Sequence, residues 1–447
     1  MNKNIDYVSV ENIESYEKDF DANEKNLVAK NAVCNVGIAE ASLNNDLIRS
    51  LNHNYSLEVE GGKVTNQLRS GRCWMFAGTN IMRFEVMKNL NIKNMELSQN
   101  FTLFYDKLEK SNFFLENIIK TVSEPLEGRL VNHLLKDPIG DGGQWDMFVS
   151  LIEKYGICPK DCMPETFTSS NTMLMDKYIT TKLREFACIL RTEFENGKDE
   201  KALRELKNQM LETIYNILVI SLGKPPKTFT YETRDKDNKF IRIENITPVE
   251  FYKQYVKLDL SNLVSIINAP TKDKPYNRSF TVDFLGNVIG GKEVKYLNLP
   301  IKRLKELVIA SLKDGHAVWF GSDVGQFSNR NAGILAMDAY NLENTLGTTF
   351  NMTKAQRLDY GESLMTHAMT IVGVNLVDDK PNRWKVENSW GETTGKDGFY
   401  VMSEEWFNQF VYQIVIDKKY LSDAEKAQYD LDPIHLKPWD PCGSLAN

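Results

Sequence analysis

Apolar residues recur at helical spacing between residues 165 and 222. Side chains three and four positions apart fall on one face of a helix, so this pattern predicts two amphipathic helices. The inward positions are Leu183, Phe186, Ala187 and Leu190 in the first helix and Leu203, Leu206, Met210 and Ile214 in the second. Asn196-Gly197 is a turn signal that separates them. The polar faces lack the basic residues of a membrane-surface helix, so core or subunit contacts are expected.

Shorter helical segments precede this region. We predict helices near Ile13–Asp21, Ala39–Leu51 and Ser98–Asn117, the last of which is rich in aromatic residues and buried. A further helical run covers Met147–Tyr155 and ends at Gly156, which suits a helix C-cap.

A helix is also predicted directly after Cys73, ending near Asn89–Asn94. The stretch contains no proline, and one face would carry Phe76, Ala77, Asn80, Ile81 and Phe84. Ser70 and Gly71 stand just before it and are interpreted as capping and turn residues. Cys73 is therefore expected at a helix N-terminus.

The second half of the chain is richer in residues that favour strands. Residues 223–299 predict strands with long loops, and Pro300 then opens a helix that ends at Gly315. Further strands are predicted at Ala317–Gly321, Thr366–Val374, Arg383–Asn388 and Gly398–Val401. A helical part followed by a β-rich part predicts an α+β enzyme with its site between the two layers.

Composition narrows the class of protein. The chain has 447 residues and a net charge of −7, which argues against a dedicated nucleic-acid binder. No apolar run reaches the length of a membrane-spanning helix, and the N-terminus lacks the apolar core of a signal peptide. Six scattered cysteines predict reduced thiols. We therefore expect a cytoplasmic protein without a membrane partner.

Cys73 is the candidate nucleophile. The unpaired N–H groups and the dipole at a helix N-terminus favour a thiolate, which is the form that attacks a carbonyl. His367, at the start of an apolar strand, is the candidate base, and Asn388, at the end of the next strand, is the candidate group that orients it. Gln67 and the Cys73 backbone N–H are predicted to stabilise the oxyanion. Trp390 would shield the His367–Asn388 hydrogen bond from water.

Other chemistry-bearing residues receive structural interpretations. Cys158 and Cys162 would need two more ligands to hold zinc, and Asp141-Gly142-Gly143 is not followed by the Gly-Lys-Ser/Thr of a phosphate loop. The remaining cysteines are Cys34, Cys188 and Cys442, and the remaining histidines are His53, His133, His316 and His435. No metal or cofactor is predicted.

These motifs carry a family resemblance. Gln67 followed six positions later by Cys73-Trp74, a later histidine at the start of an apolar strand, and Asn-Ser-Trp-Gly at 388–391 together resemble the papain-like cysteine peptidases. Asp141-Gly142-Gly143 before a helix also resembles that family. The resemblance implies that Gly142 and Gly143 line the substrate-binding wall.

The spacing of the motifs points to one branch of that family. His367 lies 294 positions after Cys73, whereas the small papain-like enzymes have about 130–150. Together with Ser70–Trp74, Asp141–Met147, Pro164–Phe167 and Pro438–Pro441, this architecture is similar to the bleomycin hydrolase / aminopeptidase C family from about residue 60 onward.

That resemblance implies a cytosolic thiol aminopeptidase that acts on peptides without a cofactor. It implies a homohexamer whose active sites face an inner chamber, and a C-terminal segment that lies in its own cleft. Such a segment leaves room only for a short N-terminal piece of substrate, and its carboxylate can pair with the substrate's α-ammonium. Ala446 and Asn447 would then face the substrate. The ending differs from the commoner Met-Gly-Ala-Leu-Ala of the family, and we hypothesise that the enzyme trims Asn447.

The predicted organisation has five segments. Residues 1–60 form an N-terminal arm, 61–160 the helical half of a papain-like core, and 161–299 a helical and β-rich insertion with oligomer contacts. Residues 300–435 form the β-rich half with His367 and Asn388, and 436–447 form the segment in the cleft.

Two other functions stay open. One is a broader thiol hydrolase, either an endopeptidase or a bleomycin-type amide hydrolase. The other is a chamber-forming assembly that binds peptides or nucleic acid without relying on catalysis; the intact Cys–His–Asn set and the acidic charge argue against it.

Overall fold

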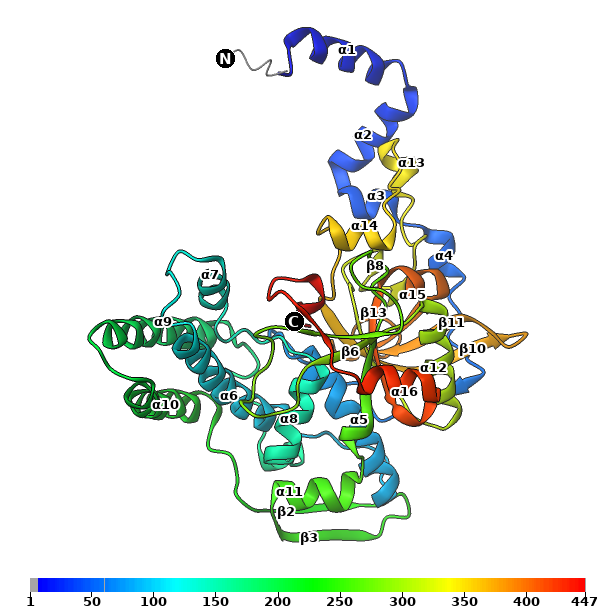
Figure 1. Ribbon diagram of the computed structural model, residues 1–447. Helices are drawn as coiled ribbons and strands as arrows, with labels where there is room; N and C mark the ends of the chain where they lie inside the picture. The colour runs from blue at the N-terminus through cyan, green and yellow to red at the C-terminus, as the bar shows by residue number, and fades with distance from the viewer. Residues whose placement is uncertain (1–6, 60, 447) are drawn as a thin grey trace.

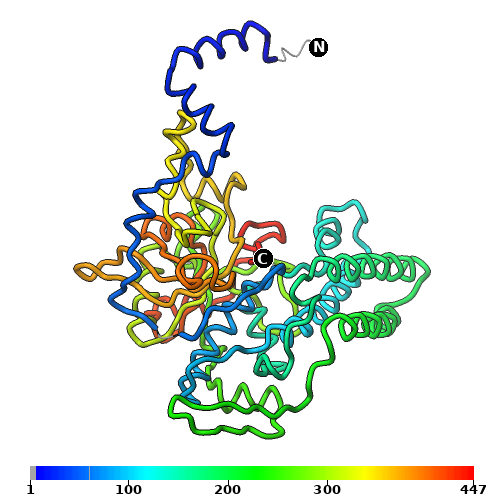
Figure 2. Tube along the Cα trace, turned by 180° about the vertical axis from the view of Figure 1, so that it is seen from behind, coloured from blue at the N-terminus to red at the C-terminus, as the bar shows by residue number. Residues whose placement is uncertain are grey.

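The computed structural model describes residues 7–59 and 61–446. A helical layer and a large sheet lie side by side, an arm from the N-terminal region projects away from both, and the C-terminal segment runs into the middle of the molecule (Figure 1). The view from behind shows the same arrangement (Figure 2). Asn447, predicted to face the substrate, lies outside the described residues.

The helical layer is built from long helices that begin and end at recognisable signals. It comprises α5 (Cys73–Leu90), α6 (Gln99–Lys120), α7 (Arg129–Lys136), α8 (Trp145–Tyr155), α9 (Met173–Glu195) and α10 (Glu200–Leu222). The side chains of Ser98 and Asp199 cap α6 and α10, and Gly156 ends α8 at a positive φ that disfavours other residues.

α5 is buried on nearly all sides. Its buried residues include Asn80 and Arg83 as well as the apolar side chains, so the single apolar face predicted for it is too narrow. The reason is its central position, because α5 packs against β10 and β7 on one side and against α8 and α6 on another. A helix in such a place is enclosed by protein all round.

Within the described residues, twelve strands form one sheet in the order β14-β5-β6-β4-β13-β7-β10-β11-β12-β9-β8, with β1 paired to β10. The strands are β1 (Leu57–Glu58), β4 (Leu263–Ile267), β5 (Arg278–Val282), β6 (Lys295–Asn298), β7 (Val318–Ser322), β8 (Ser328–Asn329), β9 (Ile334–Leu335), β10 (His367–Val377), β11 (Lys380–Glu387), β12 (Phe399–Ser403), β13 (Val411–Asp417) and β14 (Ile434–Leu436). β10 and β11 are antiparallel neighbours near its centre.

The two faces of β10 meet different partners. Thr370 on one face donates to the Ala77 carbonyl of α5, while Met369 and Ile371 on the other join a core that includes Leu304 and Leu307 of α12 (Ile301–Lys313). Alternate residues of a strand point to opposite faces, which accounts for this division. The sheet is therefore covered by α5 on one face and by α12 on the other.

The remaining elements lie at the periphery. They are α1 (Val10–Asp21), α2 (Glu24–Val36), α3 (Ile38–Ser42), α4 (Asn45–Arg49), the hairpin β2 (Phe229–Arg234) and β3 (Phe240–Ile246), α11 (Pro248–Phe251), α13 (Leu342–Leu346), α14 (Lys354–Asp359), α15 (Glu404–Phe410) and α16 (Asp423–Asp430). Short turns of other helix types occur at Lys160–Cys162, Tyr252–Val256, Leu260–Asn262, Lys418–Tyr420 and Pro441–Gly443.

Some boundaries differ from the expectation. The single helix predicted near Ala39–Leu51 is two short helices, because Leu43 pairs with Tyr340 and Asn44 then caps the second helix. Pro300 is the residue before α12 rather than its first residue, and its extended backbone leads into the helix. α2 is not among the helices predicted from the sequence, and none of its described residues is buried.

Candidate active site

His367 and Asn388 lie at the same end of neighbouring strands. β10 begins at His367 and β11 ends one residue before Asn388, so the antiparallel register brings the two side chains together. His367 Nε2 and Asn388 Oδ1 are 2.9 Å apart. The backbone N–H of Ser389 also donates to this Oδ1, at 2.8 Å. Because an amide oxygen only accepts, the Nε2 atom carries the proton and Nδ1 is the basic nitrogen.

Trp390 packs beside this hydrogen bond. Its ring centroid lies 4.9 Å from that of His367, and the guanidinium of Arg330 lies 4.7 Å from the centre of the indole on the Trp390 side chain. His367 and Asn388 are both buried. Removing water raises the strength of a hydrogen bond, so this packing suits an imidazole held in one orientation.

Cys73 is the first residue of α5 and is fully buried in the isolated chain. The backbone N–H of Ala368, next to His367, donates to Cys73 Sγ at 3.4 Å, which brings the thiol to the start of β10. Burial raises the pKa of the Cys73 thiol to about 12, although the N–H groups of Ala368 and Trp74 act in the opposite direction. Burial thus offsets the expected helix-end preference for the thiolate, and a proton acceptor is needed.

Gln67 connects the turn before Cys73 to the segment that carries Asn388 and Ser389. Its Nε2 donates to the Ser70 carbonyl at 2.5 Å, and its Oε1 accepts from Ser389 Oγ at 2.6 Å. An amide nitrogen has two hydrogens, so the bond to Ser70 uses one of the two. Leu68, the next residue, has φ of +54°, an uncommon value for a residue with a side chain. Backbone strain of this kind is typical of functional sites.

Ser70 does not cap α5, so this prediction is wrong. The helix begins after Arg72 and has no side-chain cap. Ser70 Oγ instead donates to the Gln67 carbonyl at 2.7 Å and accepts from Arg72 Nε at 2.9 Å. The serine therefore stabilises the turn that carries Gln67 rather than the helix.

Arg72, directly before Cys73, forms a partly buried ion pair that the sequence motifs do not predict. Its two terminal nitrogens donate to the two oxygens of Glu165 at 3.1 and 2.9 Å. A bidentate pair is geometrically specific. Glu165 lies within the Pro164–Phe167 motif, but the motif alone does not show that Glu165 pairs with Arg72.

Asp141 is a second missed residue. Its Oδ2 accepts from the Gly71 N–H at 2.8 Å and from the Thr172 hydroxyl, and its Oδ1 pairs with Lys107 Nζ at 2.7 Å. Lys107 also pairs with Asp176 of α9 at 2.7 Å. Burial by itself raises the pKa of Asp141, but Lys107 outweighs this and holds that pKa well below its usual range. The ionised carboxylate thus ties the nucleophile turn to the helical layer.

A third buried pair lies behind Asn388. Arg83 of α5 pairs with Glu387 Oε1 at 2.5 Å and donates to the Lys63 carbonyl at 2.6 Å. Burial, only partly offset by Arg83, raises the pKa of Glu387 to about 7. The pair links the nucleophile helix to the strand that ends at Asn388.

Gly143 is paired with the chain's own C-terminal segment. Its N–H donates to the Ala446 carbonyl at 3.1 Å, and the Ala446 N–H donates back to its carbonyl at 3.2 Å. Gln144 Nε2 donates to the Ser444 carbonyl at 2.5 Å. A Cβ on residue 143 would lie 2.4 Å from the indole of Trp74, so only glycine fits. Ala446 is fully buried.

Comparison with known proteins assigns the family. The model of the Peptidase C1-like family matches residues 7–443. The chain belongs to the Peptidase C1-like family. The predicted enzyme class, a papain-like cysteine peptidase, is confirmed by this match.

Relatives within the family cover the whole chain. Aminopeptidase C of Listeria monocytogenes serovar 1/2a is 48% identical over 439 residues, which is 98% of this chain and 99% of the relative. Human bleomycin hydrolase is 44% identical over 400 residues, 88% of each chain. The crystal structure of PepW from Lactobacillus rhamnosis has a TM-score of 0.96 and 48% identity, and it covers 98% of this chain and 99% of that one. The bleomycin hydrolase / aminopeptidase C resemblance and the α+β papain-like fold are confirmed.

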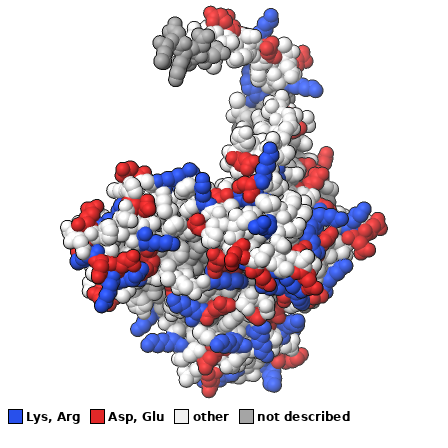
Figure 3. Space-filling model, in the orientation of Figure 1, with Lys and Arg blue, Asp and Glu red and all other residues white. Residues whose placement is uncertain are grey.

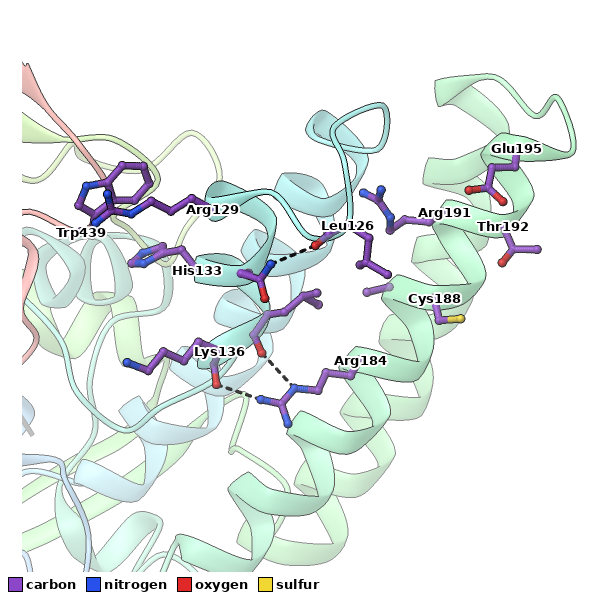
Figure 4. Close-up of a pocket in the computed structure, with 13 residues that line it drawn as sticks. Leu126, Arg129, His133, Lys136, Arg184, Cys188, Arg191, Thr192, Glu195 and Trp439 are labelled. Atoms are coloured by element: carbon purple, nitrogen blue, oxygen red, sulfur yellow. Dashed lines mark hydrogen bonds between the residues drawn. The ribbon is translucent and has the colours of Figure 1, made fainter. Parts of the chain in front are cut away.

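The C-terminal segment of this C1-like peptidase is held at several points before it reaches Gly143. The guanidinium of Arg129 in α7 lies 3.8 Å from the centre of the Trp439 ring (Figure 4). Asp440 pairs with buried Lys274 at 2.9 Å. Trp439 also closes one end of a cavity of about 820 Å³ between α7 and α9, which does not include Cys73, His367 or Asn388 in its lining.

The described residues contain neither a candidate metal site nor a helix that could span a membrane. Within 7–59 and 61–446, no group of three or more His, Cys, Asp or Glu side chains is arranged to hold a metal ion. Over that same part of the chain, none of the helices is both long and apolar enough to cross a membrane.

Proposed function

We propose that this cysteine aminopeptidase releases N-terminal residues from peptides through an acyl-enzyme thioester, and that its own C-terminal segment restricts the cleft. The pairing of Gly143 with Ala446 carries the proposal. It occupies the backbone groups that an extended peptide would need on that side of the nucleophile.

The proposed reaction begins when His367 Nδ1 takes the proton of Cys73. The thiolate sulfur attacks the carbonyl carbon of the first peptide bond, and the carbonyl electron pair moves to oxygen to form the oxyanion. His367 then gives the proton to the leaving amine, the C–N bond breaks, and a thioester remains. Water attacks the thioester with His367 as base, which restores the thiol and releases the amino acid.

Two groups are proposed to stabilise the oxyanion. These are an N–H of the Gln67 side chain and the backbone N–H of Cys73. Asn388 is proposed to orient His367 without adding a charge beside the thiolate–imidazolium pair. The oxyanion role of Gln67 is supported by its bonds to Ser70 and Ser389, because they hold its amide in one place during the reaction.

The C-terminal segment is proposed to limit how much substrate enters. With Ala446 on Gly143, only a peptide whose chain begins near Cys73 would fit. The terminal carboxylate would pair with the substrate's α-ammonium, which favours a free N-terminus. Gly142, Gly143 and Trp390 are proposed to border the substrate, together with Ala446 and Asn447. The intact mass of active protein tests whether Asn447 is trimmed, and retention of Asn447 would contradict trimming.

Oligomerisation is part of the proposal. We propose a cytoplasmic homo-oligomer, a hexamer by resemblance, in which the arm of residues 1–60 and the insertion of residues 161–299 make contacts. No described residue of α1 or α2 is buried, and Val10, Tyr16 and Val28 are largely exposed. Figure 3 shows that the part of the arm next to the main body of the molecule is mostly uncharged on this face. Light scattering should give the mass of six chains, and a monomer would contradict this part.

A broader hydrolase is the second candidate, favoured by the 44% identity to human bleomycin hydrolase. The deciding experiment compares an aminoacyl fluorogenic amide with its N-acetylated twin, under thiol, with Cys73→Ala as control. Hydrolysis of the free amine alone, lost in the variant, supports the aminopeptidase. Equal hydrolysis of both substrates would favour the broader hydrolase. No hydrolysis of either by protein whose Cys73 still alkylates would favour a binding assembly.

A further inference from the structure

Lys110 of α6 is a buried cation with three close polar partners. Its Nζ lies 2.7 Å from the Gly140 carbonyl oxygen, 2.7 Å from the Gly142 carbonyl oxygen and 2.8 Å from Asp106 Oδ2. The Lys110 side chain is 7% exposed and that of Asp106 is fully buried. Two of its donors are hydrogen-bonded to the carbonyls, and its charge is paired with Asp106.

The two carbonyls belong to the loop that ends at Gly143. In this loop, Lys107 Nζ also donates to the Ile139 carbonyl at 2.8 Å, and Trp74 Nε1 donates to the Asp141 carbonyl at 2.7 Å. Four consecutive carbonyl groups, from residue 139 to residue 142, are therefore held by buried donors. The next carbonyl, that of Gly143, is the one that accepts from Ala446.

Lys110 is also placed against the ring that supports Gly143. Its Nζ lies 5.3 Å from the centre of the Trp74 indole, and that indole leaves no room for a Cβ on residue 143. A displacement of the Lys110 ammonium would therefore release both the loop carbonyls and one side of the ring. The Gly143 edge is thus held by this cation together with Lys107 and the Trp74 indole.

We propose that Lys110 is a positioning residue for exopeptidase specificity, because it fixes the loop edge to which the C-terminal segment pairs. This inference rests on the proposed function, in which that segment restricts the cleft. Burying a charge is unfavourable unless it is paired, so a buried lysine directed at backbone carbonyls is a strong constraint on the loop. Lys110 touches neither the thiol nor the described part of the C-terminal segment.

The test compares Lys110→Met with Lys207→Met. Lys207 of α10 is a matched control, because it is also buried and pairs with Asn112 and Glu116 of α6 at 2.7 Å, but it does not touch the loop. The readout is the ratio of kcat/KM for the N-acetylated amide to that for the free amine. Loss of hydrogen bonds to a charged group predicts a rise of about tenfold in K110M and no change in K207M.

Five results would overturn the inference or separate it from the proposed function. An unchanged ratio in folded K110M, or an equal rise in K207M, contradicts the role of Lys110. If K110M does not fold, Lys110→Arg replaces it. A planar guanidinium cannot reproduce the three ammonium contacts, so the ratio of kcat/KM values should rise about threefold. No rise in K110R contradicts the inference. A chain ending at Gly443 should lose selectivity altogether. If this truncation stays selective, the proposed function fails; if it relaxes while K110M does not, only this inference fails.

Discussion

The two sides of the cleft are held in place by different kinds of interaction. On the sheet side, three neutral groups contact His367 or Gln67: the Asn388 amide, the Ser389 hydroxyl and the Trp390 indole. On the helical side, the loop before Gly143 is held by Lys107 and Lys110 together with ionised Asp141.

This difference has a physical reason. A fixed charge beside the catalytic pair would favour one protonation state of the thiol or imidazole, whereas a neutral amide orients a ring without doing so. A loop of backbone carbonyls has no such restriction, and a buried cation satisfies several carbonyls at once. Asp141 is the exception, because its charge reaches Cys73 and raises the pKa of the thiol.

The largest expected effect is at the centre of the neutral side. His367→Ala should lower kcat/KM for a free aminoacyl amide by about 10³-fold or more, because the thiol loses its proton acceptor. Cys73→Ala sets the background rate. Alkylation of Cys73 by iodoacetamide should also slow, and alkylation at the wild-type rate would contradict the assignment of the base.

Gln67→Ala should lower kcat by about 10²-fold, the usual loss for one oxyanion donor. Gln67→Glu sharpens the comparison, since it keeps the shape but introduces a negative charge where the oxyanion forms. Its kcat should fall below that of the alanine variant. A kcat of Gln67→Glu equal to that of the wild type would contradict a donor role for residue 67.

Asp141→Asn changes the charged side. Removal of the charge weakens the bond to Gly71 and should lower kcat/KM about tenfold. It also removes repulsion of the thiolate, so the pKa of Cys73 should fall and alkylation should begin at lower pH. Asp141 also has two charged neighbours, Lys107 and Asp176, and both are unchanged in the variant. A shift to higher pH would contradict this account.

The smallest effect on turnover, a few-fold at most, is expected for Glu387→Gln, since Arg83 and Glu387 lie behind Asn388 and do not touch His367. The raised pKa of Glu387, about 7, means that the folded state binds a proton more tightly than the unfolded state. This group's contribution to stability is present below the unfolded pKa and is lost as pH rises to about 7.

The free energy of unfolding of wild type minus that of Glu387→Gln should therefore fall as pH rises from 5 to 8, by at most about 3 kcal/mol. Chemical denaturation at several pH values measures this difference. A difference that rises with pH would mean that the Arg83 ion pair dominates over burial.

Local motifs in the sequence point to candidate residues on one side of the site but not on the other. Cys73, His367, Asn388 and Gln67 stand in local motifs, and each motif has a residue spacing that identifies its chemistry. The neutral side could be proposed from the chain alone for that reason. The elements that carry these residues, α5, β10 and β11, follow from periodicity, with boundaries within a few residues.

The charged side depends on contacts that no local pattern contains. Lys110, Asp141 and Glu165 resemble ordinary surface charges in sequence. Only the packed structure shows that Lys110 and Asp141 are buried and that Glu165 is partly buried. The capping role predicted for Ser70 is wrong for a related reason. A serine before a helix usually caps it, but here the Ser70 hydroxyl donates to the Gln67 carbonyl instead.

The central claim is that the C-terminal segment makes the cleft exclusive to free N-termini. The most direct measurement follows an internally quenched peptide, acetylated at its N-terminus, with the full chain and with a chain ending at Gly443. The account predicts internal cleavage by the truncated chain and none by the full chain, with Cys73 titrating equally in both. Cleavage by both chains, or by neither, would contradict the claim.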